Sequence, residues 1–518
     1  MISTAEQLIA SVADARDADD DARARVVAAV SPDLIESLLH AQLVGEHADD
    51  VVEFASGSGV SPGVATGQVY FTAEAALDGY DRGEEVVLLC AETTPADEVG
   101  MRVAAAIVTS RGGVASHAAV VARGLGLPAV CGVDGLVVTE TTATCGEYHL
   151  EPGDHITVDG AAGTVTVGAS ELHHDGPPPE LFELLRWADR LATVAVRANA
   201  DTAADVALAL EYGAVGVGLC RTEHMFLGER LPIIQRALLA TDPAEEAEAL
   251  HALTEQQRAD FAEVLGALNQ QPITIRLLDA PLHEFLADRD EHPEHNPMLG
   301  LRGVRLSLLR PEILRAQLTA LVEAMGDAAA EGHNPEVEVL VPLVIGEAEF
   351  ARARQEVLAA TTNQLIAAGL QRDISGALPV GAMIETPRAA LVAGRLAAEG
   401  EFLSFGTNDL TQMTFGFSRD DVERQIVPSY RRQGLLDNNP FASIDQDGVG
   451  WLIKHAVTAA RRRNPAIKIG VCGEQGGDPA SVEFLVDVGV DYVSCSPYRV
   501  PLARLIAGQK AYADRQTD

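Results

Sequence analysis

The second part of the chain alternates between short apolar runs and longer stretches rich in Ala, Leu and Glu. Short runs of Val, Ile and Leu bounded by Gly or Pro are typical of buried strands, and the stretches between them have helical composition. Eight such runs follow one another, at residues 193–199, 215–221, 273–279, 337–344, 380–386, 402–408, 467–473 and 491–496. Strands that alternate with helices in this number predict a closed (β/α)8 barrel. An open doubly wound sheet is the alternative, but no GxGxxG follows the first run.

The residues before the first of these runs have a different pattern. Residues 1–50 are rich in Ala, Asp and Arg with helical spacing, which predicts one or two short helices. From about Ser56 to Ser170, short Val-rich runs lie between Gly and Pro residues, with a hairpin pattern around residues 160–163. A proline run at 177–179 then precedes a helical pattern. We therefore expect a helical N-terminal arm (1–55), a smaller α/β domain (56–170), a linker (171–190) and the barrel (191–518).

Polar residues gather where the predicted barrel strands end. In barrels of this kind, active groups lie at the carboxyl ends of the strands. One polar residue there would only reflect the edge of a loop, but several that converge on one rim favour a functional site. These residues are Arg221, Arg276, Asp279, Glu385, Asn408, Asp409 and Cys472.

Length and composition are those of an ordinary globular protein. The chain has 518 residues, of which 47% are hydrophobic and 22% charged. No run of about 18 apolar residues lacks charge, so no membrane span is predicted. The N-terminus also lacks the basic and then apolar pattern of a signal peptide. The six cysteines are scattered without a CxxC pair, which favours a reduced, cytoplasmic protein.

The net charge of −38 excludes one class of partner. A nucleic acid backbone would be repelled by a protein of this charge, so we expect no nucleic acid partner. Lysine occurs at only three positions, and arginine carries most of the positive charge. We attach no function to the bulk charge, but individual arginines still matter because their planar fork suits phosphate and carboxylate groups.

The segment 110–132 is the most informative part of the sequence. Gly112 and Gly113 permit a tight turn, and the residues after them have helix-forming composition with Ser116 as the expected cap. His117 is therefore predicted at the N-terminus of a helix, where free N–H groups and partial positive charge favour an attached phosphoryl group. A neutral imidazole nitrogen can attack phosphorus, and the phosphoimidazole can give the group up again.

The same segment carries a family resemblance. Its residues 112–130, GGVASHAAVVARGLGLPAV, resemble the phosphohistidine loop of the phosphoenolpyruvate-utilising enzymes. In the barrel region, GLCRTEHMF, RLLDAPLHEF, NPMLGLRGVRL, MIETPRAAL, SFGTNDLTQMTFGFSRDD and GVCGEQGGDP resemble the dikinase branch of that family. The resemblance implies a swivelling phosphohistidine domain that precedes a barrel for phosphoenolpyruvate and pyruvate. One departure is Ala115, where the family usually has Thr.

The resemblance also implies a role for each residue of the site. His117 would carry the phosphoryl group, and Cys472 would protonate the enolate of pyruvate as a general acid. Glu385 and Asp409 would hold Mg²⁺ as hard oxygen ligands. The residues that would bind the substrate are Arg221, Arg276, Glu385, Gly406, Thr407, Asn408 and Asp409, with Arg302 and Arg305 as weaker candidates.

Three functions are compatible with these motifs. The first is the phosphoenolpyruvate/pyruvate half-reaction of a pyruvate phosphate dikinase, with ATP chemistry on a separate ATP-grasp chain, because about 55 residues precede the histidine domain and no P-loop is present. The second is a phosphocarrier enzyme of the enzyme I type that passes phosphate to another protein. This alternative is weakened because the sequence before His117 leaves no room for the helices with which enzyme I docks its carrier protein. The third is a non-catalytic phosphoenolpyruvate-binding regulatory protein, which predicts decayed catalytic residues that this sequence does not show.

The resemblance has mechanical and assembly consequences. A histidine that must reach two different sites needs a mobile domain, so we expect hinges at the linker 171–190 and in the N-terminal arm. It also implies a homodimer through the barrel. Two weaker signals favour ordinary surface structure. Residues 288–295, DRDEHPEH, are predicted to form a solvated loop, and the arginine run 461–463 is predicted to lie on an exposed helix face.

Overall fold

The computed structural model describes residues 1–43, 52–94, 97–113, 116–173, 176–226, 230–281, 285–286, 294–370, 377–423 and 426–517. The chain divides into two compact units. The first holds Met1–Ala192, Phe417–Ala442 and Arg504–Asp518, and the second holds Thr193–Gly416 and Ser443–Ala503. The domain bounds expected from the sequence stay predictions, because a compact unit is not the same as a domain that folds alone.

The second unit contains a closed barrel of eight parallel strands in chain order. The last strand pairs with the first, with Ala195 opposite Tyr492 and Ala198 opposite Cys495, and this closes the ring. The predicted (β/α)8 barrel is confirmed, and the open sheet is excluded. The strands are β14 (Ala195–Asn199), β15 (Val217–Arg221), β16 (Pro272–Arg276), β17 (Glu336–Val341), β18 (Val380–Ile384), β19 (Phe402–Phe405), β20 (Lys468–Val471) and β21 (Tyr492–Cys495).

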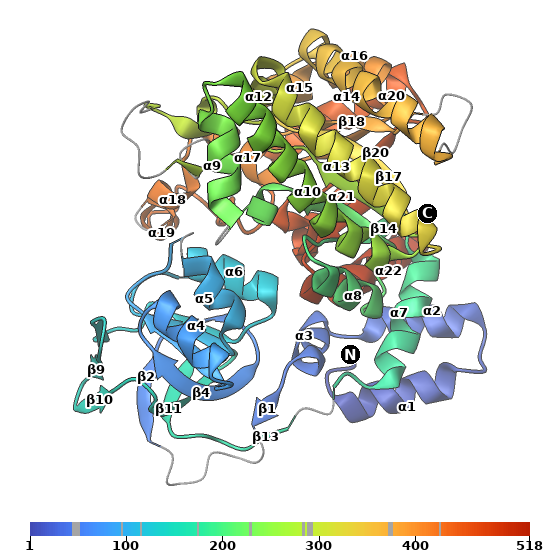
Figure 1. Cartoon of the computed structure of the whole chain (residues 1–518). Coiled ribbons are helices and arrows are strands. Elements are labelled where there is room, and N and C mark those ends of the chain that lie inside the picture. The colour runs from blue at the N-terminus through green and yellow to red at the C-terminus, as the bar shows by residue number, and fades with distance from the viewer. Residues whose placement is uncertain are drawn as a thin grey trace. The chain divides into compact units, whose positions relative to one another are not determined.

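Helices cover the outer side of the barrel strands (Figure 1), and α14 packs against β17 and β18. This cover explains why β18 and β19 are buried at every position and carry almost continuous apolar sequence. The helices between and after the strands are α8 (Ala203–Glu211), α9 (Leu231–Leu239), α10 (Pro243–Leu268), α12 (Gly303–Leu309), α13 (Pro311–Ala330), α14 (Glu347–Ala368), α15 (Pro387–Leu391), α16 (Ala393–Glu399), α17 (Thr407–Phe415), α20 (Val449–Arg463), α21 (Pro479–Val488) and α22 (Val500–Thr517).

The amino-terminal half of the barrel interior holds an ionic cluster, here named the floor cluster, of Arg197, Thr274, Glu338 and Lys468. One oxygen of Glu338 accepts from the Arg197 guanidinium at 3.3 Å and from the Thr274 hydroxyl at 3.1 Å. The other oxygen pairs with the Lys468 ammonium group. The Arg197 guanidinium also lies 4.3 Å from the centre of the Tyr492 ring. Both carboxylate oxygens are therefore matched by donors inside the barrel.

The first unit contains an eight-stranded mixed sheet in the order β2-β12-β11-β4-β5-β6-β7-β3. Its helices α4 (Ala73–Asp81), α5 (Glu98–Val103) and α6 (His117–Leu125) bury Ala76, Met101 and Ala119 in one apolar core with residues of the sheet. The strands are β2 (Glu53–Ser56), β3 (Ser58–Ser61), β4 (Val64–Tyr70), β5 (Val86–Cys90), β6 (Ala106–Thr109), β7 (Ala129–Cys131), β11 (His155–Asp159) and β12 (Thr164–Val167). A smaller sheet of β8 (Val137–Val138), β9 (Ala143–Cys145) and β10 (Tyr148–Leu150) adjoins it.

The hairpin expected around residues 160–163 is confirmed. Strands β11 and β12 pair antiparallel, with Asp159 opposite Thr164. Gly163 adopts a positive φ of 74°, which a residue without a Cβ tolerates.

The N-terminal arm holds three helices, where the sequence predicted one or two: α1 (Ala5–Ala15), α2 (Asp20–Ala29) and α3 (Pro32–Leu39). Helices α1 and α2 pack against α7 (Pro179–Leu191). The Arg16 guanidinium lies 2.8 Å from the Glu183 carboxylate. The expected linker thus contains all of α7 except its last residue, as well as β13 (Leu172–His173), which pairs with β1 (Gln42–Leu43).

The remaining sequence expectations have mixed outcomes. Within the arginine run, Arg462 and Arg463 are exposed as predicted, but Arg461 is half-buried and lies 2.8 Å from Asp491. Most of the segment 288–295 lies outside the described residues, and so does Ala115. Two short helices, α18 (Arg419–Val422) and α19 (Ile426–Arg432), complete the fold. In the described part of the chain, no helix has the length and apolar character needed to cross a bilayer.

Candidate functional site

His117 is the first residue of α6, as the sequence predicted. The Ser116 side chain caps this helix by accepting a hydrogen bond from the Ala119 N–H at 3.3 Å. Gly112 lies in the loop before it with a φ of 107°, where a Cβ would lie 2.9 Å from the Ser116 hydroxyl oxygen. The glycine therefore makes room for the cap that starts the helix at the histidine.

Thr93 orients the imidazole of His117. Its hydroxyl lies 2.9 Å from Nδ1 of the ring, and its side chain is buried. A hydrogen bond to one ring nitrogen fixes the orientation of the ring and determines which of the two nitrogens carries the proton. No local pattern indicates this contact, because Thr93 lies in a different loop, after β5.

The carboxyl end of the barrel holds a second ionic cluster, here named the mouth cluster, of Glu223, Arg276, Asp279, Arg302, Glu385 and Asp409. Arg276 is the last residue of β16 and pairs with Glu223 and, at 3.2 Å, with Asp279. Arg302 pairs with Asp279 at 2.8 Å and with Asp409 at 3.3 Å. The two arginines hold the carboxylates in place around one point of the barrel rim.

Three of these carboxylates face one another closely enough to share a cation. One oxygen each from Asp279, Glu385 and Asp409 lie within 4.8 Å of one another. Glu385 and Asp409 were the predicted metal ligands, and Asp279 is an addition. Its position at a predicted strand end was the available signal, but the sequence could not show that it faces the other two.

Glu385 is fully buried and is held by an unusual backbone. One of its oxygens accepts a hydrogen bond from the N–H of Leu343, a residue with a φ of 57° that few residues other than glycine adopt. Its Oε2 atom has no hydrogen-bond partner among the residues that the structure describes. Burial first, and then the nearby Asp279 and Asp409, raise the pKa of Glu385 well above its usual range.

These residues fit a divalent cation. Hard carboxylate oxygens are the ligands that Mg²⁺ prefers. Glu385 offers a buried oxygen that has no hydrogen-bond partner among the described residues. Glycines also keep the space open: a Cβ on Gly406 would lie 2.6 Å from Oε2 of Glu385, and one on Gly303 would lie 2.7 Å from Asp279. The chemistry of the donor set therefore agrees with the predicted Mg²⁺.

Cys472 follows β20 and is buried. Its Sγ atom lies 3.3 Å from the Ser404 hydroxyl and 3.5 Å from the Phe405 carbonyl oxygen. Burial raises the pKa of this thiol to about 11, although Ser404 and Arg276 act in the opposite direction. The group therefore remains a protonated thiol at neutral pH, as a proton donor must.

The predicted substrate contacts after β19 are partly engaged within the protein. The Thr407 side chain is fully buried, and its hydroxyl hydrogen-bonds to Gln475, so a contact from this residue would have to use its backbone. Asn408 accepts a hydrogen bond from the Glu474 N–H at 3.3 Å through its side-chain oxygen. Its amide NH₂ group is the donor that could reach a ligand. Gly406 immediately precedes α17, whose N-terminus favours negative charge.

Arg221 ends β15 as predicted. Its N–H donates to Asp201 at 2.6 Å, and its guanidinium lies 3.8 Å from the same carboxylate. The weaker candidates differ from each other, because Arg302 belongs to the mouth cluster whereas Arg305 donates to the backbone oxygens of Leu299 and Gly300. Arg305 therefore holds its own loop.

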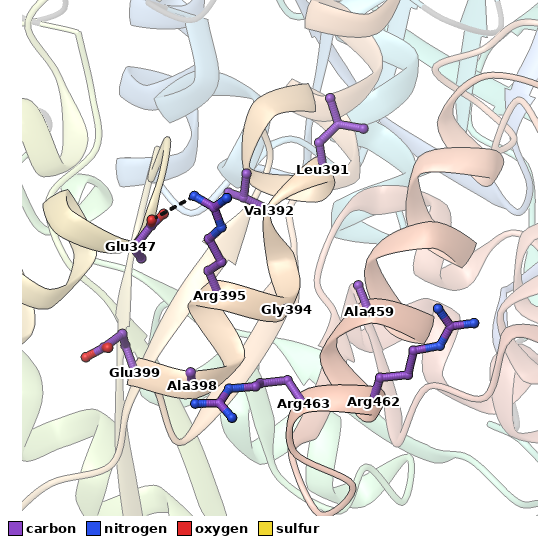
Figure 2. A pocket seen from close by; sticks show the side chains of 10 residues that line it. All are labelled: Glu347, Leu391, Val392, Gly394, Arg395, Ala398, Glu399, Ala459, Arg462 and Arg463. Atoms are coloured by element: carbon purple, nitrogen blue, oxygen red, sulfur yellow. Dashed lines mark hydrogen bonds and ion pairs between the residues drawn. The ribbon is translucent and has the colours of Figure 1, made fainter.

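A groove of about 650 Å³ lies elsewhere on the barrel, between α16 and α20. Figure 2 shows Arg395 turned toward Glu347. Its guanidinium lies 3.0 Å from the Glu347 carboxylate, and Gly394 and Ala398 also line the groove. None of the predicted site residues line this groove. It is thus separate from the mouth cluster.

Comparison with known proteins gives a consistent assignment. The family profile described as "PEP-utilising enzyme, PEP-binding domain" matches residues 180–512, and the one described as "PEP-utilising enzyme, mobile domain" matches residues 83–163. The chain is 41% identical over 511 residues to pyruvate, phosphate dikinase 1, chloroplastic, of Arabidopsis thaliana, covering 93% of this chain and 52% of that protein.

Two bacterial relatives give the same result. The chain is 40% identical to the pyruvate, phosphate dikinase of Rhizobium meliloti, covering 95% of this chain and 57% of that protein. It is 42% identical to the pyruvate, phosphate dikinase of Clostridium symbiosum, covering 87% of this chain and 54% of that protein. The chain thus spans about half the length of the curated relatives it matches.

Proposed function

Because the chain belongs to the family of phosphoenolpyruvate-utilising enzymes, we propose that it moves a phosphoryl group between phosphoenolpyruvate and His117, with pyruvate as the other product. This is the phosphoenolpyruvate/pyruvate half-reaction of a pyruvate phosphate dikinase, the activity named for its relatives. The observation that carries the proposal is the mouth cluster, where Asp279, Glu385 and Asp409 converge beside Arg276 and Arg302.

The charges at the mouth suit this substrate. Phosphoenolpyruvate carries a phosphate and a carboxylate, and bidentate guanidinium groups recognise both. Arg276 is held in place by two carboxylates, and Arg221 contacts Asp201 with its guanidinium at 3.8 Å. These two residues would bind the phosphate. A divalent cation held by Asp279, Glu385 and Asp409, when bound, would offset negative charge on the substrate and on its enolate.

The phosphoryl step follows from the geometry of His117. Since Thr93 engages Nδ1, the nitrogen that would attack phosphorus is Nε2. A bond forms between Nε2 and phosphorus, the bond between phosphorus and the enol oxygen breaks, and the enolate of pyruvate remains. The start of α6 favours the negative charge of the phosphohistidine.

The proton step uses Cys472. Its S–H bond breaks and a C–H bond forms at the methylene carbon of the enolate, whose oxygen becomes the keto oxygen of pyruvate. In the opposite direction the thiolate would take the proton back. The raised pKa of Cys472, about 11, keeps the proton on sulfur until the enolate is present.

The rest of the cycle stays a proposal of the same kind. A separate ATP-grasp protein or a phosphocarrier protein would exchange phosphate with phosphorylated His117, and the linker 171–190 would act as a hinge. A homodimer through the barrel and a cytoplasmic location are also proposed. An alternative of the enzyme I type would differ in its phosphate acceptor, and a regulatory protein would bind phosphoenolpyruvate without phosphorylating His117.

One experiment tests the proposal. Purified protein is incubated with Mg²⁺ and phosphoenolpyruvate labelled with ³²P, and protein-bound label and pyruvate are measured. We expect equal amounts of pyruvate and acid-labile protein phosphate, and loss of both in His117→Asn. Pyruvate release that survives His117→Asn, or binding without any transfer, would overturn it. Candidate acceptors are then added: ATP formed from AMP and pyrophosphate identifies dikinase chemistry, and transfer to a small protein alone identifies the phosphocarrier alternative.

A further inference from the structure

Asn199 is the last residue of β14, and no motif of the sequence drew attention to it. Its side chain makes two hydrogen bonds to distant parts of the barrel. Its oxygen accepts from the Ser494 hydroxyl at 2.7 Å, and its NH₂ group donates to the carbonyl oxygen of Cys472 at 3.2 Å. One half-buried amide thus joins the first strand, the eighth strand and the loop that carries the catalytic thiol.

The contact with Cys472 is not part of the barrel's backbone ladder. β14 pairs with β15 and β21, whereas Cys472 follows β20. The side chain of Asn199 therefore reaches past β21 to hold a residue two strands away. The recorded pairing of β20 with β21 involves Gly470 and Val471, and Cys472 comes directly after it.

The carbonyl of Cys472 needs such a restraint. It belongs to the peptide unit shared with Gly473, a residue whose backbone is permissive because it has no Cβ. A side chain on Gly473 is excluded, since its Cβ would lie 1.7 Å from the hydroxyl oxygen of Thr407. The N–H of Cys472 is fixed by the Phe405 carbonyl at 3.0 Å. Asn199 fixes the other side of the residue, and together these contacts set the direction of the Cα–Cβ bond.

We infer that Asn199 is a positioning residue that aims the S–H group of Cys472 at the methylene carbon of the enolate. The inference rests on the proposed function and goes beyond it. It requires that Asn199 act on proton transfer, in which the S–H bond breaks and the C–H bond forms, and not on the earlier transfer of the phosphoryl group to His117. A misplaced donor of this kind slows its own step by about tenfold to a hundredfold.

Two variants separate this role from a general structural one. Asn199→Asp keeps the oxygen that accepts from Ser494 but loses the donor to Cys472. Ser494→Ala has the opposite effect, because it removes the donor to Asn199 and leaves the contact with Cys472 possible. Asn199→Ala serves in the same assays if Asn199→Asp does not yield folded protein, as judged by circular dichroism and thermal unfolding.

The assay follows the two steps in single turnovers. Phosphoenolpyruvate carrying deuterium stereospecifically at its methylene carbon reacts in tritiated water, and the protein-bound phosphate and the chirality of the pyruvate methyl group are both measured. We expect wild type and Ser494→Ala to give methyl groups of one chirality. Asn199→Asp should phosphorylate His117 within about twofold of the wild-type rate while giving largely racemic methyl groups, because free enolpyruvate is protonated from either face in water.

The outcomes separate this inference from the proposed function. If wild-type protein does not become phosphorylated, the proposed function fails. If it becomes phosphorylated and Asn199→Asp still gives a single chirality, the inference is wrong. It is also wrong if Asn199→Asp and Ser494→Ala slow both steps equally, since that result describes a structural contact alone.

Discussion

The barrel contains two buried ionic clusters, one in its floor and one at its mouth, and they are built on opposite principles. In the floor cluster, Glu338 is shared by Arg197, Thr274 and Lys468, and both of its oxygens have donors. In the mouth cluster, four carboxylates face two guanidinium groups, and Oε2 of Glu385 has no described partner. The floor carboxylate is therefore fully paired within the chain, whereas the mouth has more carboxylates than guanidinium groups.

This difference distinguishes a cluster that stabilises the fold from a cluster that is suited to bind a ligand. A buried charge is tolerated when it is paired and hydrogen-bonded, and the floor cluster satisfies that condition within the chain. The mouth cluster does not satisfy it alone, because its carboxylates outnumber its arginines, and a bound divalent cation would supply positive charge there. Burial first, and then the surplus of negative charge from Asp279 and Asp409, raise the pKa of Glu385. Two matched Glu→Gln substitutions can test this contrast.

Glu385→Gln should give the largest effect on activity. The substitution removes a charge from the proposed cation site, so we expect phosphorylation of His117 by phosphoenolpyruvate to fall by about a thousandfold. Its stability should stay close to wild type, because Gln can still accept from the Leu343 N–H and the lost oxygen has no described partner. Initial rates and urea unfolding are measured on the same preparation. A variant with normal rates would show that the mouth cluster is not the cation site.

Glu338→Gln should do the reverse. It leaves the Arg197 and Lys468 cations without their carboxylate, and breaking a buried pair typically costs about 3 kcal/mol or more. We expect a loss of about 3 kcal/mol in the free energy of unfolding, measured with urea, since Lys468 is partly exposed. Activity per folded molecule should stay within about twofold of wild type. An exposed pair provides the control: Glu347→Gln, which removes the partner of Arg395, should barely change unfolding.

The sequence predicted the barrel strands well but not these two clusters. Each strand is a local apolar run, so its existence can be read from neighbouring residues, and the cap of α6 at Ser116 depends on residues three apart. Glu338 instead meets Arg197 from another strand, and Asn199 meets Cys472, which lies 273 residues later in the chain. Such contacts depend on strand register and on closure of the ring, which no local pattern contains.

The arm shows a different reason for a missed element. Helix α2 is mainly polar and buries Ala24 and Val27. Its apolar face is so narrow that the sequence pattern does not identify it as a separate helix. Thr93 was missed because its hydroxyl meets His117 only after β5 and α6 have packed. In both cases tertiary packing, and not the local sequence, decides the outcome.

Addition of Mg²⁺ should stabilise the protein through the mouth cluster alone. A ligand that binds only the folded state at a hundred times its dissociation constant adds about 2.7 kcal/mol. After treatment with EDTA, we expect Mg²⁺ to restore stability of this order to wild type and to Glu338→Gln, but not to Glu385→Gln. Thermal unfolding with and without the cation gives the comparison. Equal stabilisation of all three proteins would place the cation elsewhere.

The smallest expected effect concerns Cys472, whose thiol burial keeps protonated. Burial raises the pKa of its thiol from 9.0 to about 11, so the folded state holds this proton more tightly than the unfolded state does. The corresponding stability is present below pH 9 and is lost as the pH rises toward 11. Between pH 8 and pH 10, wild type should lose about 1.4 kcal/mol more than Cys472→Ala in urea unfolding. The other buried thiols are common to both proteins and cancel in this difference, so parallel pH profiles would show that burial does not hold the proton on this sulfur.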